Sequence, residues 1–205
     1  MAAIATIPAA DDAAIADWLH GRLARALERV PEGIAISIPG GSTPFPILRH
    51  LAARDLEWSR IAVWPGDDRA VSESHPASNA GRIRALLGPL GAHVQALDTG
   101  SEPPHFALVW LGMGADGHIA SLFPSADPGV DDPLPVRRLT PDPLPPEAPF
   151  ERISLTIPAL LDSDELLFVI RGEEKRAVFE QACRGGDLPI ARLLGAARQP
   201  VTCFT

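Results

Sequence analysis

A buried strand, followed at once by a glycine-rich turn and a histidine, constrains this chain more than any other feature. Residues 106–111 form an uninterrupted apolar run, with the length and composition of a strand buried on both faces of a parallel sheet. Three glycines follow within the next six residues and allow positive φ angles and the close approach of a ligand to the main chain. His118 then stands near the carboxyl end of the strand, where open α/β sheets bind their ligands. We therefore expect the stretch from Phe106 to Pro124 to carry an active site.

Two other interpretations of this stretch compete with a catalytic one. A histidine after a strand is often an ordinary solvated loop residue. The spacing of Gly112, Gly114 and Gly117 also matches the G-x-G-x-x-G motif of dinucleotide-binding proteins. That motif opens a long helix and has an acidic residue some twenty positions further on. Here His118 follows the third glycine, so the sequence disfavours a nucleotide site.

The composition is that of an ordinary globular protein with one domain. A chain of 205 residues can bury a substantial core, and a hydrophobic content of 46% with 21% charged residues is typical of such proteins. The formal charge of −8 argues against a nucleic acid or an anionic membrane as a partner. An anionic substrate therefore has to be bound by a local cluster of cations. Lys175 is the only lysine among the 18 basic residues, and this rarity makes it a residue to follow along the chain.

The sequence also predicts a cytoplasmic protein without a metal site. Residues 1–14 contain no basic segment and carry Asp11 and Asp12, which is unlike a secretory signal. No run approaches the twenty apolar residues that a membrane span needs. Cys183 and Cys203 have neither a disulfide framework nor metal-ligand spacing, as in proteins of a reducing compartment.

Hydrophobic periodicity predicts helices and strands that alternate along the chain. Helices are expected over 9–30, from Pro44 onward, through 83–87, over 157–161, through 175–182 and over 189–194; strands are expected over 34–38, 61–64, 93–97, 106–111, 152–156 and 166–170, with a last edge strand over 201–204. Between Pro124 and Pro149 the chain is rich in proline and has no periodicity. We expect an irregular surface excursion there, and a flap over the site is one use for it.

The turn made of Gly40, Gly41, Ser42 and Thr43 joins a β-branched strand to the next helix. Thr43 is the expected N-cap, with Pro44 at the first helical position. Free backbone N–H groups and the helix dipole make such a turn a natural anion site. A plain, well-capped turn without a ligand explains the same residues.

Polar residues follow two other predicted strands. Asp67, Asp68 and Arg69 could contact a polyol and a charged group, or could form a solvated turn. Asn79 is an ordinary residue for the start of a helix. Lys175 lies in the first turn of a predicted helix, where the helix dipole favours acids, and this mild conflict suggests a functional use.

Five segments taken together resemble the 6-phosphogluconolactonase family, in that family's order. They are PGGSTP (39–44), DDRAVSESHPASN (67–79), GMGADGHIASLFP (112–124), RISLT (152–156) and GEEK (172–175). The resemblance implies an α/β fold with a doubly wound, mostly parallel sheet and helices on both faces, related to glucosamine-6-phosphate deaminase and ribose-5-phosphate isomerase. It also implies hydrolysis of 6-phosphoglucono-δ-lactone to 6-phosphogluconate without a metal or cofactor, in an oxidative pentose phosphate or an Entner–Doudoroff route.

The catalytic loop contains residues suited to this reaction. His118 can act as a base near neutral pH, and its conjugate acid can protonate the leaving ring oxygen. Asp116 either orients the imidazole or shapes the turn. Backbone N–H groups of the glycine loop, which includes Gly114 and Gly117, are candidates to stabilise the developing oxyanion. No G-x-S-x-G segment is present to supply a serine nucleophile, and no HExxH segment to bind a metal.

The resemblance also assigns the binding residues. It implies that the 6-phosphate is held by the turn from Gly40 to Thr43 together with Arg152 and Lys175, while Arg69 also faces the substrate. Charge-assisted hydrogen bonds to a phosphate are strong enough for a few such cations to overcome a negative net charge. Asp67 is a candidate for binding sugar hydroxyls.

Two other functions fit the same fold. Aminosugar-phosphate deaminase-isomerases resemble this chain through DGHIA, but they continue with an acid where Phe123 stands and usually have an aromatic residue in place of Arg69. A sugar-phosphate-binding protein without turnover is the second alternative. The lactonase interpretation predicts a small phosphorylated lactone as the partner, and a monomer or weak homodimer.

Overall fold

The computed structural model describes residues 2–144 and 149–205 and contains two sheets. The strands are β1 (Ile4–Ile7), β2 (Ile34–Ile38), β3 (Ile61–Pro65), β4 (Asp67–Arg69), β5 (His93–Val94), β6 (Leu108–Leu111), β7 (Val136–Leu139), β8 (Arg152–Leu155), β9 (Leu166–Val169) and β10 (Val201–Phe204). The helices are α1 (Asp12–Arg29), α2 (Pro44–Ala52), α3 (Asn79–Leu87), α4 (Ile157–Leu161), α5 (Glu173–Cys183) and α6 (Pro189–Ala196), with short 3-10 turns at Trp58–Arg60, Gly88–Leu90 and Pro124–Ala126. No helix in these two ranges is both long and apolar enough to cross a membrane.

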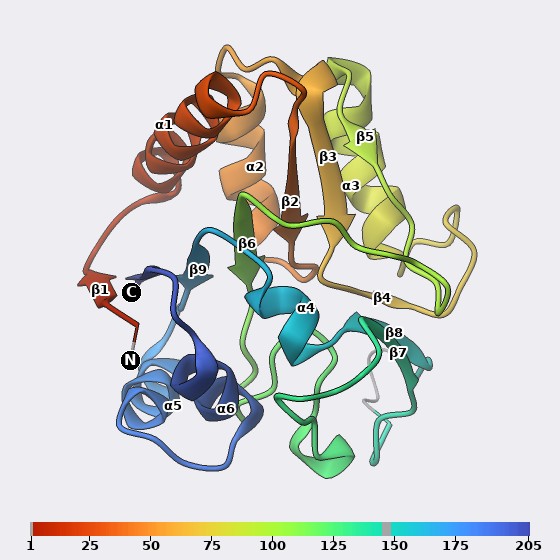
Figure 1. Ribbon diagram of the computed structural model, residues 1–205, viewed down its shortest axis with the longest axis vertical. Helices are drawn as coiled ribbons and strands as arrows, with labels where there is room; N and C mark the ends of the chain where they lie inside the picture. The colour runs from red at the N-terminus through yellow and green to blue at the C-terminus, as the bar shows by residue number, and fades with distance from the viewer. Residues whose placement is uncertain (1, 145–148) are drawn as a thin grey trace.

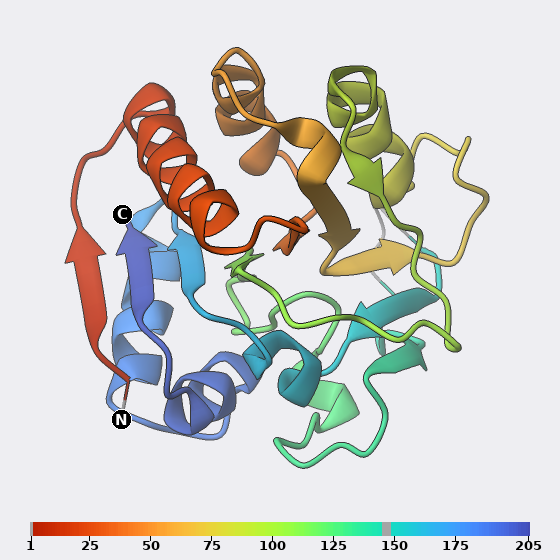
Figure 2. The same ribbon diagram turned by 45° about the horizontal axis from the view of Figure 1, so that its top comes forward.

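The larger sheet has seven parallel strands and is covered by helices on both faces, as predicted. Its order is β1-β10-β9-β6-β2-β3-β5. Because strand side chains alternate, Ile34, Ile36 and Ile38 of β2 pack into one apolar cluster with α1, α2 and α3. Ala35 belongs to the opposite cluster, which contains residues of α4, α5 and α6. In Figure 2, α1–α3 lie along one side of the sheet, and α5 and α6 lie on the other.

The chain reverses its direction of travel across the sheet between β2 and β6. From β2 it adds β3 and then β5 outward on one side, and from β6 it adds β9 and then β10 outward on the other. The carboxyl ends of β2 and β6 therefore border the crevice at which open α/β sheets bind their ligands. Both strands point the same way in the middle of Figure 1.

Three short strands form a separate antiparallel sheet in the order β4-β8-β7. The residues Asp67–Arg69, which could have formed a turn, pair as β4 with β8. The prediction of an irregular excursion over 124–149 is wrong for Val136–Leu139, which pair with β8 as β7. A four-residue strand in which only Val136 is buried leaves no alternating pattern to detect. Residues 145–148 of the predicted excursion lie outside the described residues.

The prediction that residues 201–204 form an edge strand is also wrong. β10 lies between β9 and β1, and all four of its residues are buried. The strand β1 was not predicted, because its central residues Ala5 and Thr6 are exposed and only Ile4 and Ile7 are partly buried. β1 covers β10 in parallel, so the two ends of the chain lie side by side (Figure 1).

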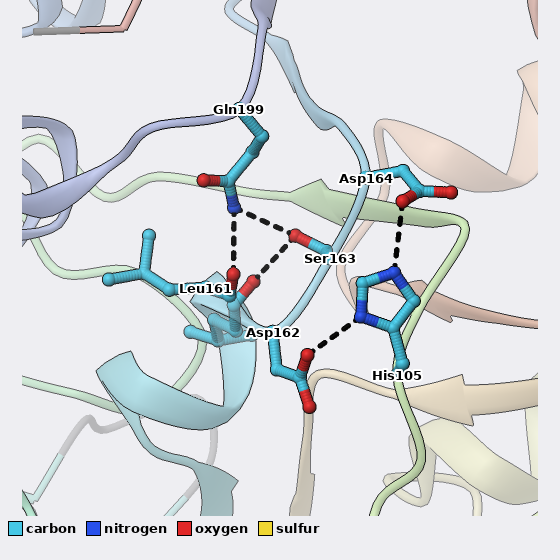
Figure 3. A network of polar contacts seen from close by, with 7 residues as sticks. His105, Leu161, Asp162, Ser163, Asp164 and Gln199 are labelled. Atoms are coloured by element: carbon cyan, nitrogen blue, oxygen red, sulfur yellow. Dashed lines mark hydrogen bonds and ion pairs between the residues drawn. The ribbon is translucent and has the colours of Figure 1, made fainter.

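A histidine fastens the loop before β6 to the loop before β9. The Nδ1 atom of His105 lies 2.7 Å from Oδ1 of Asp162, and its Nε2 atom lies 3.0 Å from Oδ1 of Asp164 (Figure 3). Beside it, Gln199 donates a hydrogen bond of 2.9 Å to Ser163 Oγ. This network lies at the amino ends of β6 and β9, away from the crevice at their carboxyl ends.

Candidate active site

A cleft of about 460 Å³ opens at the carboxyl ends of β2, β6 and β9. It is lined by the turn after β2, the loop after β6, residues of β4 and β8, and the first turn of α5. Ten of the twelve residues predicted for the site line it, namely Gly40, Gly41, Ser42, Thr43, Asp67, Arg69, Gly114, His118, Arg152 and Lys175. Asp116 and Gly117 belong to the same loop as His118 but are not part of the lining.

The predicted catalytic loop, residues 112–123 after β6, is closed by its own backbone. The N–H of Gly114 donates to the carbonyl of His118 at 2.9 Å, and the N–H of Gly117 donates to the carbonyl of Gly114 at 3.1 Å. A Cβ atom on Gly114 would overlap the imidazole of His118, so only glycine fits there. Gly117 has a φ of +79° and lies against Leu188.

These internal hydrogen bonds change the expected roles of the two glycines. The N–H groups of Gly114 and Gly117 are already paired within the loop, so they are not free donors for an oxyanion. Gly117, which was expected among the substrate-binding residues, is buried outside the cleft. Both glycines instead let the loop turn tightly enough to hold His118 at the cleft wall.

His118 is held on one side and open on the other. Its Nδ1 atom lies 2.6 Å from Oδ1 of Asp116, and a carboxylate can only accept, so Nδ1 carries the proton. Its ring packs against Phe123, with 4.6 Å between ring centroids. Nε2 makes no hydrogen bond to any residue that the structure describes, and the side chain is 30% exposed. A neutral imidazole in this tautomer has the lone pair of Nε2 available as a base.

The turn after β2 presents unpaired donors at the start of α2. Among the described residues, the N–H groups of Gly41, Ser42 and Thr43 have no backbone or side-chain acceptor. Gly41 has a φ of +88°, which suits glycine. Thr43 precedes the helix as predicted, but its side chain makes no capping hydrogen bond. These donors and the positive end of the helix dipole have the chemistry that suits an anion.

Asp68 holds β4 against the start of α3. One of its carboxylate oxygens accepts from the N–H groups of Arg69 at 2.8 Å and Asn79 at 2.6 Å. The other accepts from Ser78 Oγ at 3.0 Å and from the N–H of Ala80 at 2.9 Å. With both oxygens engaged and its side chain buried, Asp68 has a structural role, so only its neighbours face the cleft.

Asp67 is the carboxylate of the cleft lining. Ser121 Oγ donates to its Oδ2 atom at 2.5 Å. Burial raises the pKa of Asp67; the hydrogen bond from Ser121 and the charges of Arg69 and Arg152 oppose this effect, while the charge of Asp68 adds to it. An ionised Asp67 therefore depends on the donors and cations that surround it.

Two arginines flank Asp67. Arg69 Nη1 donates to the side-chain oxygen of Asn79 at 2.8 Å, which fixes its guanidinium at the cleft wall. Arg152 is buried and donates to the carbonyl of Phe150 at 3.0 Å. Its pKa is lowered, first by burial and then by repulsion from Arg69, yet an arginine remains charged at neutral pH. The two guanidiniums concentrate positive charge on one wall.

The described lining of the cleft holds four basic side chains and one carboxylate. The basic residues are Arg69, Arg152, Arg171 and Lys175. Lys175 lies in the first turn of α5, as predicted. This cluster is the local reversal of charge that a protein with a formal charge of −8 needs to bind an anionic substrate.

Three residues with polar or charged side chains in the described cleft lining, Asn79, Ser121 and Arg171, were not predicted from the sequence. Arg171 follows β9, and its guanidinium donates to Asp12 Oδ1 and to the carbonyl of Ala10, both at 3.1 Å. Its position after a buried parallel strand was a usable signal. Asn79 was interpreted as a helix start only, and Ser121 as part of the family segment. Their contacts with β4 join residues far apart in sequence, which no local pattern shows.

The described residues include no group of three or more histidine, cysteine or acidic side chains placed to hold a metal ion.

The fold and the cleft together define a class of protein. It is a doubly wound α/β protein with a histidine, a helix-start anion site and a cation cluster at the switch point of its sheet. The family of glucosamine-6-phosphate isomerases and 6-phosphogluconolactonases matches residues 9–99 and 90–202, and the chain belongs to this family.

Known proteins support this assignment. A 6-phosphogluconolactonase of Mesorhizobium japonicum is 34% identical over an alignment of 214 positions, which covers 93% of this chain and 89% of that protein. The crystal structure of a 6-phosphogluconolactonase from Thermotoga maritima has a TM-score of 0.83 at 24% identity, covers 98% of both chains, and shows the same fold. A monomeric glucosamine-6-phosphate deaminase has a TM-score of 0.76 at 16% identity, covering 98% of this chain and 96% of its own. The fold alone therefore does not separate the two activities.

Proposed function

We propose that this protein hydrolyses 6-phosphoglucono-δ-lactone to 6-phosphogluconate. The observation that carries the proposal is the imidazole of His118, held through Nδ1 by Asp116 and open at Nε2 beside a cleft with four basic side chains. A δ-lactone is an activated ester, so its hydrolysis needs an oriented water, a base near neutral pH and stabilisation of negative charge. The cleft offers the base and the positive charge, and a water molecule held by His118 would complete the set without a protein nucleophile.

The reaction follows from the geometry of His118. Its Nε2 atom takes a proton from a water molecule as the water oxygen attacks the lactone carbonyl, which gives a tetrahedral oxyanion and an imidazolium. The oxyanion then collapses, the bond between the carbonyl carbon and the ring oxygen breaks, and the imidazolium returns its proton to that oxygen. Asp116 stabilises the imidazolium and keeps the ring in one orientation throughout.

The phosphate binds to the turn after β2 and to Lys175. The N–H groups of Gly41, Ser42 and Thr43, at the start of α2, donate hydrogen bonds to the phosphate. The ammonium of Lys175 adds a charge-assisted contact. Phosphate binding at a fixed point places the lactone ring over the loop that carries His118. Binding energy from this remote group thereby orients the reacting carbonyl.

The wall of the cleft formed by Asp67, Arg69 and Arg152 binds the sugar ring and stabilises the negative charge that develops on the carbonyl oxygen. Asp67 accepts hydrogen bonds from ring hydroxyls. Since the loop amides of Gly114 and Gly117 are paired internally, the guanidiniums of Arg69 and Arg152 are the better candidates to stabilise the oxyanion.

The contacts of His118 favour the lactonase over a deaminase-isomerase. Phe123 stands where the sequence comparison with deaminases expects an acid, and its ring packs on the imidazole. An apolar side chain in this place cannot transfer a proton for the opening of an aminosugar ring. We further propose that the enzyme acts in the cytoplasm, as a monomer or weak homodimer.

The test is hydrolysis of freshly generated 6-phosphogluconolactone by the purified protein in the presence of a chelator. Unphosphorylated gluconolactone and glucosamine 6-phosphate are assayed beside it. We expect rapid hydrolysis of the phosphorylated lactone, much slower hydrolysis of gluconolactone, and no ammonia from glucosamine 6-phosphate. Folded protein that does not exceed the spontaneous rate of lactone hydrolysis would instead support a binding protein, and release of ammonia would support the deaminase.

A further inference from the structure

Ser121 contacts two residues that face each other across the small sheet. Asp67 of β4 and Ser154 of β8 are paired in the antiparallel register. The backbone N–H of Ser121 donates to Ser154 Oγ at 3.1 Å, and the hydroxyl of Ser121 donates to Asp67 Oδ2 at 2.5 Å. Ser121 and Ser154 are 1% and 0% exposed, so water has little access to compete for these two hydrogen bonds. Among the described residues, Ser121 therefore supplies the hydrogen bonds that join the catalytic loop to the β4–β8 pair.

The direction of each hydrogen bond is fixed by the partners. Ser154 Oγ uses its proton on the carbonyl of Leu155 at 3.0 Å, so it acts as the acceptor for the N–H of Ser121. The hydroxyl proton of Ser121 then goes to the carboxylate of Asp67. The backbone of Ser121 anchors the loop, and its side chain acts on Asp67 alone.

This contact leaves one oxygen of Asp67 for the substrate. Oδ2 is engaged by Ser121, while the hydrogen bond that Oδ1 accepts from the described residues comes from the side-chain amide of Asn79 at 3.5 Å, the limit of a hydrogen bond. That amide also donates to the backbone carbonyl of Asp67 at 2.8 Å, which is its better contact. Since Asp67 lines the cleft, Oδ1 is the oxygen that remains to accept a hydrogen bond from a ligand.

The surroundings of Asp67 determine how the hydroxyl of Ser121 affects the pKa of this carboxyl group. Burial favours the neutral acid and raises the pKa of Asp67, and the charge of Asp68 acts in the same direction. The hydrogen bond from Ser121 and the charges of Arg69 and Arg152 favour the carboxylate. His118 faces the same cleft from the catalytic loop. Removal of the Ser121 hydroxyl therefore shifts this balance toward the neutral acid.

We propose that Ser121 is a positioning residue that holds Asp67 as a hydrogen-bond acceptor, with its Oδ1 atom turned to a ring hydroxyl of the lactone. This inference rests on the proposed function, since it assigns a specificity contact within the same cleft. The hydrogen bond from Ser121 to Asp67 also joins the catalytic loop to β4. It thereby fixes His118, on that loop, relative to Asp67, which accepts the hydrogen bond from the sugar.

Ser121→Ala isolates the side-chain contact, because alanine keeps the N–H that donates to Ser154. We expect kcat/KM for 6-phosphogluconolactone to fall about tenfold, in keeping with the loss of a hydrogen bond to a charged group. We also expect the acidic limb of the pH profile of kcat/KM to move to higher pH, because Asp67 then takes up a proton more readily.

Ser154→Ala is the matched control. It removes the acceptor for the loop backbone and leaves the hydroxyl of Ser121 on Asp67. We expect this variant to lose thermal stability while the acidic limb stays at its wild-type position. If Ser121 served only to dock the loop, Ser154→Ala would reproduce the kinetic effects of Ser121→Ala, and the proposal would be overturned.

A double-mutant cycle with Asp67→Asn tests the partner directly. In the Asp67→Asn background, Ser121→Ala should change kcat/KM by less than about twofold, because the carboxylate on which it acts is gone. An undiminished tenfold loss in that background would contradict the proposal.

A measurement that needs no turnover separates this inference from the proposed function. The pKa of Asp67 is read from the pH titration of its carboxyl carbon by NMR, in the wild type and in Ser121→Ala. A higher pKa in the variant supports the inference, and an unchanged pKa overturns it. Absence of lactone hydrolysis by the wild-type protein would overturn the proposed function whatever the titration shows.

Discussion

Two histidines in this molecule are bound to aspartates, and their surroundings give them opposite capacities. In the network at the amino ends of β6 and β9, both ring nitrogens of His105 lie within hydrogen-bond distance of a carboxylate, from Asp162 and Asp164 (Figure 3). In the cleft, only Nδ1 of His118 meets a carboxylate, from Asp116, and Nε2 is open.

The difference lies in the number of carboxylates. Two of them favour the doubly protonated ring, so the pKa of His105 is raised, first by the contact with Asp162 and then by that with Asp164. A ring with both nitrogens engaged has no lone pair to offer, and His105 serves to join two loops. One carboxylate fixes the tautomer of His118 and leaves a base at the cleft. Of these two histidines, only His118 therefore has a ring nitrogen whose lone pair is available for it to act as a base.

The largest expected effect comes from His118→Ala. Loss of a general base typically costs 10²- to 10⁴-fold in rate, so we expect kcat for 6-phosphogluconolactone to fall by about that range. His105→Ala is the matched control, since it removes a histidine with more carboxylate contacts, and its kcat should stay at the wild-type value. Near-normal kcat in folded His118→Ala would contradict the contrast between the two histidines, because Nε2 of His118 would then have no role in the reaction.

Lys175→Ala should have the next largest effect, and mainly on KM. The ammonium contributes a charge-assisted contact to the phosphate, and its loss should raise KM about ten- to hundredfold with a smaller change in kcat. Arg176→Ala removes a positive charge from the same turn of α5, outside the cleft lining, and should leave KM within about twofold. Equal effects of the two variants would reduce the role of Lys175 to general electrostatic attraction.

Asp116→Asn sharpens the comparison by keeping the shape of the contact and removing its charge. The amide oxygen can still accept from Nδ1, but it stabilises the imidazolium less, so we expect kcat to fall about tenfold with KM nearly unchanged. The measurement is a steady-state comparison with the wild type. A loss as large as that of His118→Ala would mean that the charge of Asp116 is required to keep the imidazole in the tautomer with Nε2 free.

The smallest effect concerns stability near His105. Because its folded pKa is raised, the contacts with Asp162 and Asp164 stabilise the protein fully below the unfolded pKa of histidine, and this contribution is lost as pH rises through the folded pKa. The side chain is 54% exposed, so solvent screening limits the effect on Tm of His105→Ala to roughly 1–3 °C at pH 5.5, shrinking by pH 9.

Thermal unfolding of the wild type and His105→Ala at both pH values checks this prediction. His93→Ala serves as the control, since the Nε2 atom of His93 faces the carbonyl of Ser59 at 3.0 Å in place of a carboxylate. A difference in Tm that grew with pH would show that the two carboxylates do not favour protonated His105.

The parts of the site that are continuous in sequence could be predicted. The loop that carries His118 follows a buried strand directly, and the turn from Gly40 to Thr43 lies between a strand and a helix, so local pattern located both at the same edge of the sheet. The doubly wound sheet was likewise implied by segments that lie in a recognisable order.

The parts built from distant residues could not be predicted. Ser121 and Asp67 are joined by one hydroxyl across 54 positions, and no periodicity connects them. Of the small sheet, β8 was predicted, but β4 and β7 were missed because strands of three or four residues are stabilised by their pairing with β8, not by a pattern of their own. β10 was predicted at an edge because β1, which covers it, is half exposed.

Nitrogen NMR of the histidine side chains tests the central claim most directly. The spectrum is recorded at pH 8.5, above the usual titration range of histidine, and the signals are assigned with the His118→Ala and His105→Ala variants. We predict that His118 carries its proton on Nδ1 and has a bare Nε2. A proton on Nε2 of His118 would contradict the account, because the nitrogen at the cleft would then have no lone pair with which to activate water.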